Sequence, residues 1–452
     1  MSAAIEGDTT TPPREATGDR NKEIRRVAAA TFIGTTLEWY DFYLYAACAA
    51  LVFGPLFFPG ADPLAGQLGA LATFAVGFVA RPLGGAVAGH FGDRWGRKRM
   101  LVITLMVMGL STVAVGVLPT YDSAGALAPI LLVVLRILQG LAMGGEWGGA
   151  VSMAVEHAPP HRRAFYASAP MMGSPAGLIL ANVVLLGLVA ATGESFTTWG
   201  WRLGFLSSIV LVALGFYIRR QVSESPLFDN HVAAEPERIP LVQIIRRHPG
   251  ALIKTLVVAG VPGISTYMVL TYTLTYGTTV VDYSRQSLLV VGIAVCAVQL
   301  VLLPLAARIG DRSGTHRLVL VGTVLQGLAA LLFFPLFDTG NFPLAVLASI
   351  VAVIPTVLSY AALPTVLSDQ FPAKVRYTGI SMAYQLGAIV GGGIAPIIAT
   401  AIFAATGVSF LIGMYMAAAN VIALAFAFLL RGRSARSTGT PVQHAVPVPD
   451  TA

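Results

Sequence analysis

The chain has 452 residues, of which 56% are hydrophobic and only 11% are charged, with a formal net charge of +7. Because soluble domains carry roughly 25% charged residues, this composition excludes a soluble globular protein. A positive net charge would suit a nucleic-acid-binding protein. Most of the basic residues, however, lie in the tails or in short segments between apolar runs, so we expect no nucleic-acid partner.

Apolar runs long enough to cross a bilayer follow one another along the chain, separated by charged or Gly/Pro-rich segments. A membrane-spanning helix needs about 20 residues, and lipid offers no partners to open backbone groups, so each run predicts a helix. In chain order the expected spans are 27–58, 66–90, 100–119, 127–154, 164–191, 200–218, 251–280, 287–308, 317–337, 342–367, 377–404 and 408–430. The predicted fold class is therefore an all-α membrane protein with twelve transmembrane helices.

Polar segments at both ends and in the middle divide the chain. We expect disordered cytoplasmic tails at 1–24 and 432–452, because these segments are polar and contain Ser/Thr/Pro-rich stretches. The remaining residues are expected to form two six-helix halves, 25–218 and 251–431, joined by a cytoplasmic linker loop at 219–250.

Lys and Arg residues gather in alternate loops between the spans, whereas the other loops carry Asp and Glu. The basic loops contain, among others, Arg97, Arg162, Arg246, Arg312 and Lys374. Basic loops remain on the cytoplasmic side of a bacterial inner membrane. We therefore predict a multi-pass inner-membrane protein with both termini in the cytoplasm, where anionic lipid headgroups favour the positive charge.

Two short motifs each occur twice. The segment GHFGDRWGRKR at 89–99 returns in weaker form as RIGDRSGTHR at 308–317, and EHAPPHRR at 156–163 returns as DQFPAKVR at 369–376. The two halves of the chain are therefore pseudo-symmetric. In one large class of transporters, parallel halves of this kind place the substrate site at the interface between them.

Several of these motifs resemble those of a known family. GHFGDRWGRKRML is similar to the signature loop of the major facilitator superfamily. Five further segments resemble motifs of the metabolite:proton symporter family within that superfamily. They are EWYDF (38–42), VARPLGG (79–85), QGLAMGGEWGGA (139–150), EHAPPHRRAFY (156–166) and WGWRLGF (199–205). The similarity runs from about Thr31 to Arg431 and is strongest to the shikimate-transporter branch, with the proline/betaine and citrate branches more distant. The resemblance implies the major facilitator fold, alternating access, and an important role for the two acids in EWYDF.

Glu38 and Asp41 are candidates for proton coupling, because they lie three residues apart on one face of the first span, near mid-depth. Desolvation at that depth favours the protonated form of a carboxyl group, so such a group can take up a proton on one side and release it on the other. Arg81 in the second span is the expected partner of one of them. The alternative is a permanent ion pair that only joins two helices.

Arg136 in the fourth span is the first candidate for binding an anionic substrate, since a guanidinium can hold a carboxylate through two parallel hydrogen bonds. A clamp between helices is its alternative role. Other polar side chains in the spans complete the expected substrate site, namely Gln139, Asn182, Tyr267, Tyr272, Tyr384 and Gln385. For the tyrosines, the alternative is a place at the membrane interface.

The repeated motifs predict a gate at the cytoplasmic side. Glycines permit a tight turn there, while Asp93 can pair with Arg97, cap the next helix or reach the other half. Such pairs would hold that side closed until the halves rock. The expected gate residues are Gly89, Asp93, Arg94, Arg97, Glu146, Glu156, Arg163, Asp311, Asp369 and Arg376.

Together these patterns predict a secondary active transporter that imports a small polar metabolite by proton-coupled symport. An intramembrane arginine favours an organic acid such as shikimate, an aromatic acid or a di- or tricarboxylate. A zwitterion such as proline or betaine also presents a carboxylate, and a uniporter, an exporter or a membrane sensor are further alternatives. Phosphate-binding, nucleophile-elbow and metal-ligand motifs are absent from the sequence, so we expect no enzyme activity, no metal and no cofactor besides protons. The expected partners are the small-molecule substrate and the lipid bilayer, with the chain acting as a monomer.

Overall fold

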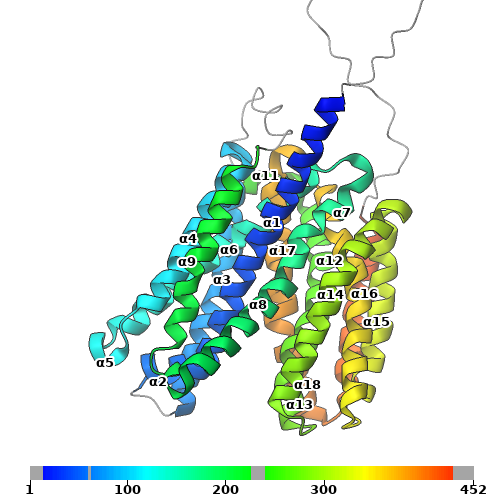
Figure 1. The fold of residues 1–452 in the computed structure, drawn as a ribbon. Helices are drawn as coiled ribbons and strands as arrows, with labels where there is room; N and C mark the ends of the chain where they lie inside the picture. Colours follow the sequence, from blue (N-terminus) through cyan, green and yellow to red (C-terminus); the bar gives the residue numbers. More distant parts are fainter. Residues whose placement is uncertain (1–13, 60–62, 225–239, 431–452) are drawn as a thin grey trace, which may run out of the picture.

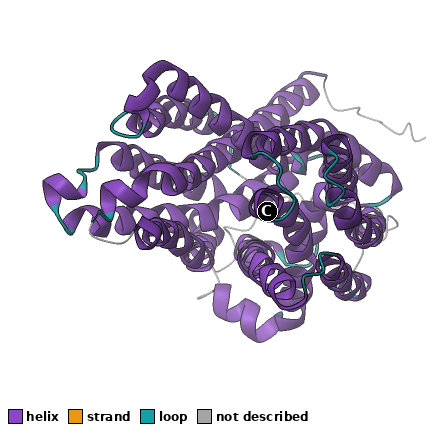
Figure 2. Cartoon of the chain, turned by 90° about the horizontal axis from the view of Figure 1, so that it is seen from below, coloured by secondary structure: helices purple, strands orange, loops and turns teal. Residues whose placement is uncertain are grey.

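The computed structural model describes residues 14–59, 63–224 and 240–430. Within these ranges the chain is almost entirely helical, without strands, and twelve helices are long and apolar enough to cross a membrane. Figure 2, which views the bundle from one end, shows the helices with only short loops between them. The predicted fold class is confirmed.

The first half is built from six long helices joined by short helical turns. The long helices are α1 (Arg14–Cys48), α3 (Pro63–Trp95), α4 (Arg97–Val117), α6 (Leu127–His157), α8 (Ala169–Thr192) and α9 (Trp201–Arg220). The short elements are η1 (Ala49–Phe53), α2 (Gly54–Phe57), α5 (Tyr121–Ala124), η2 (Pro160–Arg162), α7 (Arg163–Ala167) and η3 (Gly193–Phe196).

The second half repeats this arrangement after α11 (Pro240–Arg247). Its seventh span joins α12 (Pro249–Tyr267), η4 (Met268–Tyr272) and α13 (Thr273–Thr279). The others are α14 (Arg285–Ser313), α15 (Thr315–Phe337), α16 (Phe342–Ser368), then η5 (Ala373–Val375) with α17 (Arg376–Ala388), η6 (Ile389–Ile394) and α18 (Ala395–Thr406), and finally α19 (Phe410–Phe428). The segments η1 and η4 are both π-helical, and each ends the long first helix of its half.

The expected spans match the helices to within a few residues, but two segments differ. Residues 14–24, expected to belong to a disordered tail, are part of α1, which projects beyond its neighbours in Figure 1. They contain helix-forming Ala, Glu, Lys and Arg without proline, so the helix continues outside the lipid. The expected linker loop likewise contains α11. Residues 1–13, 225–239 and 431–452 of the predicted tails and linker lie outside the described residues.

The repeated Gly-Asp-Arg motif is mostly helical rather than a loop. α3 continues through it to Trp95, and α14 continues through the second copy to Ser313. The turn comes only at Gly96 (φ 105°) and at Gly314 (φ 97°). Both angles lie in the left-handed region that glycine adopts without strain, so a glycine is required at each turn.

We call the end of the bundle that carries Arg97, Arg163 and Arg376 the basic end, and the opposite end, with Asp122 and Asp338, the acidic end. The two halves approach each other through α3 with α17 and through α8 with α14. In Figure 1 the helices of the two halves lie close together towards the basic end, while α2 and α5 lie far from α13 and α18 at the acidic end.

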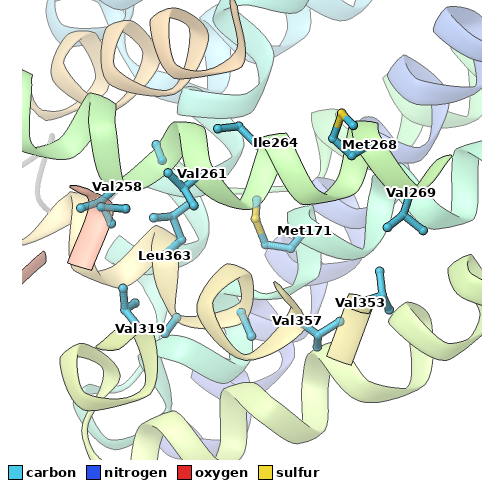
Figure 3. Close-up of a cluster of buried hydrophobic side chains, with 14 of the residues drawn as sticks. Met171, Val258, Val261, Ile264, Met268, Val269, Val319, Val353, Val357 and Leu363 are labelled. Carbon is cyan, nitrogen blue, oxygen red and sulfur yellow. The ribbon is translucent and has the colours of Figure 1, made fainter. Parts of the chain in front are cut away.

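The two halves also share one hydrophobic core. Met171 of α8 is fully buried among side chains of the second half, and Figure 3 shows it beside Ile264, Met268 and Val357. Apolar packing across the interface thus holds the halves together near the functional groups described below.

Candidate substrate and proton site

Asp41 lies at the centre of a hydrogen-bond network inside the first half. It is 5% exposed. Its two oxygens accept hydrogen bonds from the hydroxyls of Thr112 (2.8 Å) on α4 and Ser208 (2.9 Å) on α9. Gln139 donates to the Thr112 hydroxyl at 2.8 Å, and Arg136 donates to Gln139 at 3.2 Å. Four helices therefore position one buried carboxyl group through neutral hydroxyls and a chain that ends in a cation.

Arg136 is enclosed by the first half. Its guanidinium carbon lies 4.3 Å from the ring centroid of Tyr45 and 4.9 Å from that of Phe74. A Cβ at Gly77 would lie 2.6 Å from its Nε atom, so this glycine leaves the space that the side chain occupies. The structure thus brings Arg136 and Gln139, which we expected at the substrate, into the surroundings of Asp41.

Arg81 was expected to pair with Asp41 or Glu38, and the structure shows neither ion pair. Its guanidinium instead lies over the rings of Phe78 and Phe42, with ring centroids 4.2 Å and 4.6 Å from Cζ. Glu38, which is 4% exposed, interacts with it electrostatically at longer range. The faces of these rings attract the cation, so it is stabilised without direct contact to a carboxylate.

Glu146 was expected in the cytoplasmic gate, but it pairs within the first half. Arg219 of α9 donates to both of its oxygens, and Thr104 donates to Oε2 at 2.9 Å. Gly34 on α1 faces the guanidinium and leaves room for it. Arg219 was overlooked as a site residue because its place at the end of an apolar run assigned it to a loop. Its long apolar stem instead lets the charge reach back into the bundle.

Aromatic residues from both halves meet between them near mid-depth. The rings of Trp147 on α6 and Tyr384 on α17 are stacked, with centroids 3.5 Å apart and an interplanar angle of 9°. The hydroxyls of Tyr384 and Tyr360 are 2.8 Å apart, and that of Tyr43 lies 3.3 Å from the hydroxyl of Ser174. We call the four tyrosines that interact here, listed next, the tyrosine group. They are Tyr43, Tyr267, Tyr360 and Tyr384.

The sequence identified Tyr267 and Tyr384 but missed Tyr43, Tyr360 and Trp147. Tyr43 lies two residues after Asp41 in the EWYDF segment, which was a usable signal, whereas nothing in the sequence marks Tyr360.

Three other expected substrate residues lie elsewhere. Gln385 donates to the backbone oxygens of Met143 and Gly144, and so joins α17 to α6 across the interface. Tyr272 stacks on Tyr276 within the second half, with centroids 5.6 Å apart. Asn182 is only half-buried in α8 and takes no part in the groups described above.

At the basic end, Asp93 connects α3 to the beginning of α17. It accepts hydrogen bonds from the backbone N–H groups of Tyr377 (3.2 Å) and Thr378 (3.1 Å) and from the Thr378 hydroxyl (2.8 Å). A carboxylate is stabilised at a helix N-terminus by free N–H groups and by the helix dipole. Arg97 lies 3.7 Å from Asp93 in addition.

Glu156 lies between two arginines from different halves, Arg97 at 3.4 Å and Arg376 at 3.0 Å. The second repeat forms the corresponding contact, in which an acid of the second half meets the backbone of the first half. There Asp311 accepts from the backbone N–H groups of Ala164 and Phe165, at 2.8 Å and 2.9 Å.

An ion pair of 2.9 Å between Arg163 and Asp369 supports the second contact. We call these interactions across the basic end, from Asp93, Glu156, Asp311 and Asp369, the latch.

Two further gate residues behave differently from each other. Gly89 packs directly against α17, since a Cβ there would lie 2.6 Å from the Cα atom of Thr378. Arg94 is exposed and contacts His90 on its own helix, at 3.3 Å, and among the described residues it shows no contact with the second half. Because α3 stays helical through the motif, Arg94 is carried to the outer face of the helix.

The two pseudo-symmetric six-helix halves are thus held together at one end by duplicated acid-to-helix contacts. The family model of the Major Facilitator Superfamily matches residues 31–383 and 295–449. The chain belongs to the major facilitator superfamily.

Relatives of this major facilitator protein are named as transport proteins. Two proteins of Escherichia coli (strain K12) are each 40% identical to it and each cover 87% of this chain and 91% of the relative: the shikimate transporter and the inner membrane metabolite transport protein YhjE. The solved structure of the proton:xylose symporter XylE bound to 6-bromo-6-deoxy-D-glucose shares the fold. Its TM-score is 0.75 at 18% identity, and the match covers 91% of this chain and 96% of that one. The protein is a multi-pass membrane transporter of a metabolite.

In this major facilitator protein the polar contacts between halves, among the described residues, run from the basic end to the level of Arg81 and the tyrosine group. The hydrogen bonds and ring contacts near the acidic end stay within one half, as for Tyr276 with Asp338 and for Phe53 with Trp201. The transporter is therefore closed at its basic end.

Proposed function

We propose that this transporter is a proton-coupled symporter that imports a small organic acid across the bacterial inner membrane. The basic end then faces the cytoplasm, as the distribution of Lys and Arg favours. The substrate and the lipid bilayer are its partners, the proton is its coupling ion, and the single chain is the working unit.

The surroundings of Asp41 carry the proposal. Its partners are the hydroxyls of Thr112 and Ser208, which can donate to a carboxylate or accept from a carboxylic acid after rotating. Asp41 can therefore exchange a proton without breaking up its helix contacts. A fixed ion pair, such as that between Glu146 and Arg219, would lock the carboxyl group in its charged form.

The relatives support the same function. The named substrate of one relative is shikimate, an organic acid, and the structural neighbour XylE is named as a proton symporter. Arg81 and Arg136, which lie inside spans of the first half, fit an anionic cargo, since membrane-embedded cations mark the routes of ions and substrates.

The test is uptake into proteoliposomes with and without an inward proton gradient, using shikimate, protocatechuate, 2-oxoglutarate, citrate, proline and betaine. We expect the gradient to drive accumulation of one organic acid. Asp41→Asn should lose this stimulation yet keep exchange of external for preloaded internal substrate, because exchange needs no net proton movement. Asp122→Asn, which changes an exposed carboxylate, should behave as wild type.

Gradient-independent uptake by the wild type would establish a uniporter and refute symport. Retained gradient stimulation in Asp41→Asn would remove Asp41 from the mechanism, and Glu38→Gln would then test the other buried acid of α1. Preferred accumulation of proline or betaine would replace the organic acid by a zwitterion.

A further inference from the structure

Arg81 presents an unpaired guanidinium nitrogen between the two halves. The side chain is 4% exposed, and its Nη2 atom is buried without a hydrogen-bond partner. Phe78 lies against it from the first half, while Tyr267 of the second half interacts with it through its hydroxyl. Aromatic faces attract a cation but leave its N–H donors unsatisfied. Because an unpaired buried cation is costly, this position is suited to receive an anion.

Within the protein, the carboxylate of Glu38 is a candidate for this anion, and it too is incompletely paired. It interacts electrostatically with Arg81, yet its Oε2 atom is buried without a hydrogen-bond partner. A proton on Glu38 would remove the negative charge that competes for Arg81. A carboxylate from outside could then bind the guanidinium in place of Glu38, while Asp41 exchanges the coupling proton as proposed above.

Arg136 also has a buried nitrogen without a hydrogen-bond partner, its Nε atom, but its surroundings lie within one half. Its neighbours Tyr45, Phe74 and Gln139 all belong to the first half, and its Nη1 atom already donates to Gln139. A residue that contacts only one half gains or loses little when the halves rock. Arg81, by contrast, changes its surroundings whenever Tyr267 moves with the second half.

The tyrosine group determines which other chemical groups the bound anion can have. Its four hydroxyls come from α1, α12, α16 and α17, and those of Tyr267 and Tyr360 lie within electrostatic range of the other two. Hydroxyls both donate and accept hydrogen bonds, so they suit a ligand with hydroxyl groups of its own. The stacked rings of Trp147 and Tyr384 add a flat apolar wall.

We propose that Arg81 binds the carboxylate of the transported substrate, and that the tyrosine group binds the hydroxyls of a small, hydroxylated carboxylic acid. This assignment rests on the proposed function and specifies the substrate contact within it. Arg136 serves instead to position Asp41 through Gln139 and Thr112.

Calorimetric binding in detergent, without any proton gradient, tests the assignment. The probes are the acids shikimate, protocatechuate, 2-oxoglutarate and citrate, and the methyl ester of each acid that binds. We expect the hydroxylated ring acids to bind best and more tightly than their esters. Arg81→Gln should weaken binding of the acid by roughly 10- to 150-fold, as expected for a lost charged hydrogen bond, and leave the ester unaffected. Arg81→Lys should restore part of the difference.

Arg136→Gln is the matched control, because it removes the same charge from the same half. It should keep the preference for acid over ester. The opposite pattern, in which Arg136→Gln removes the preference and Arg81→Gln keeps it, would overturn the assignment, as would a wild type that binds none of the acids. Loss of gradient-driven uptake with normal binding would instead count against the symport mechanism alone.

Chemical access provides a readout that is independent of the ligand. In a background with Cys48→Ala and Cys296→Ala, which removes both native thiols, Arg81→Cys should react in proteoliposomes with an anionic methanethiosulfonate reagent. Arg136→Cys should remain unreactive. An unreactive Arg81→Cys under both directions of the proton gradient would show that this position lies off the substrate route.

Discussion

The pair of Glu146 and Arg219 shows how one half of the bundle holds two charges away from water. The two residues are 2% and 4% exposed. The carboxylate also accepts from Thr104, and the guanidinium also donates to the backbone oxygen of Leu101. Each charge is thus neutralised and hydrogen-bonded by groups that move together, so the pair stays intact while the halves rock.

Removing one partner should therefore destabilise the protein. We expect Arg219→Leu to lower the free energy of unfolding by about 3–5 kcal/mol, because it leaves Glu146 as an unpaired buried charge. The measurement is thermal unfolding in detergent. Arg220→Leu, which changes the adjacent exposed arginine, should have little effect. Equal losses in the two variants would show that the buried ion pair has no special importance.

For individual residues, the sequence predicted well which charged side chains are important, but it predicted their partners poorly. Charged residues inside apolar spans are rare and costly, so Glu38, Asp41, Arg81 and Arg136 were easily identified. Their partners depend on how each helix is rotated in the bundle, and strongly apolar spans hold little information about rotation. The roles expected for Arg81 and Arg136 from the sequence are therefore the reverse of those that we propose from their surroundings.

Among the elements, α17 is the one that the latch controls most directly. Its first turn donates two backbone N–H groups to Asp93. Its first residue, Arg376, pairs with Glu156 of α6. Movement of this single helix would release α3 and α6 at once, so the part of the latch formed by Asp93 and Glu156 opens as a unit.

We expect Asp93→Asn to favour opening at the basic end, because the amide loses the charge that stabilises the hydrogen bonds to α17. A loss of about 1.5–3 kcal/mol would increase the open population roughly 10- to 150-fold. Electron–electron resonance distances between spin labels at Arg99→Cys and Lys374→Cys should lengthen. Arg94→Gln is the control, since Arg94 is exposed and bound only to its own helix. An unchanged distance in Asp93→Asn would contradict this role of the latch.

Helix positions were predicted well because hydropathy alone identifies segments that lipid can accept. Helix ends were predicted less well. α3 continues through charged residues to Trp95, and α11 forms in a segment read as a loop. The last turns of α3 and the whole of α11 lie beyond the apolar runs, where composition no longer marks the helix. At the end of α3, the turn at Gly96 is the main signal left.

The contacts between the two halves hold the whole molecule in the state that is closed at the basic end. Latch, tyrosine group and shared core all join the halves between the basic end and mid-depth. Alternating access requires that such contacts be exchanged for others at the opposite end. The energy of the latch therefore sets how readily the transporter opens towards its basic end.

Opening one end should close the other. With spin labels at the exposed positions Tyr121 and Val280, on different halves at the acidic end, we expect the measured distance to shorten in Asp93→Asn relative to wild type. The reason is that each half moves largely as a rigid body. A distance that stays constant while the basic end opens would show that the helices bend individually.

The π-helical segments η1 and η4 give the acidic end a further way to move. A π-helical turn holds one residue more than the α-helical turns beside it, so each half carries one residue of slack at the end of its first long helix. Passing that residue along the helix would rotate the tip beyond it by about 100° without breaking the span. The tips are α2, with Phe57 packed on Trp201, and α13, with Tyr276. Rotation of α2 and α13 alone could thus close the acidic end while the long helices stay in place.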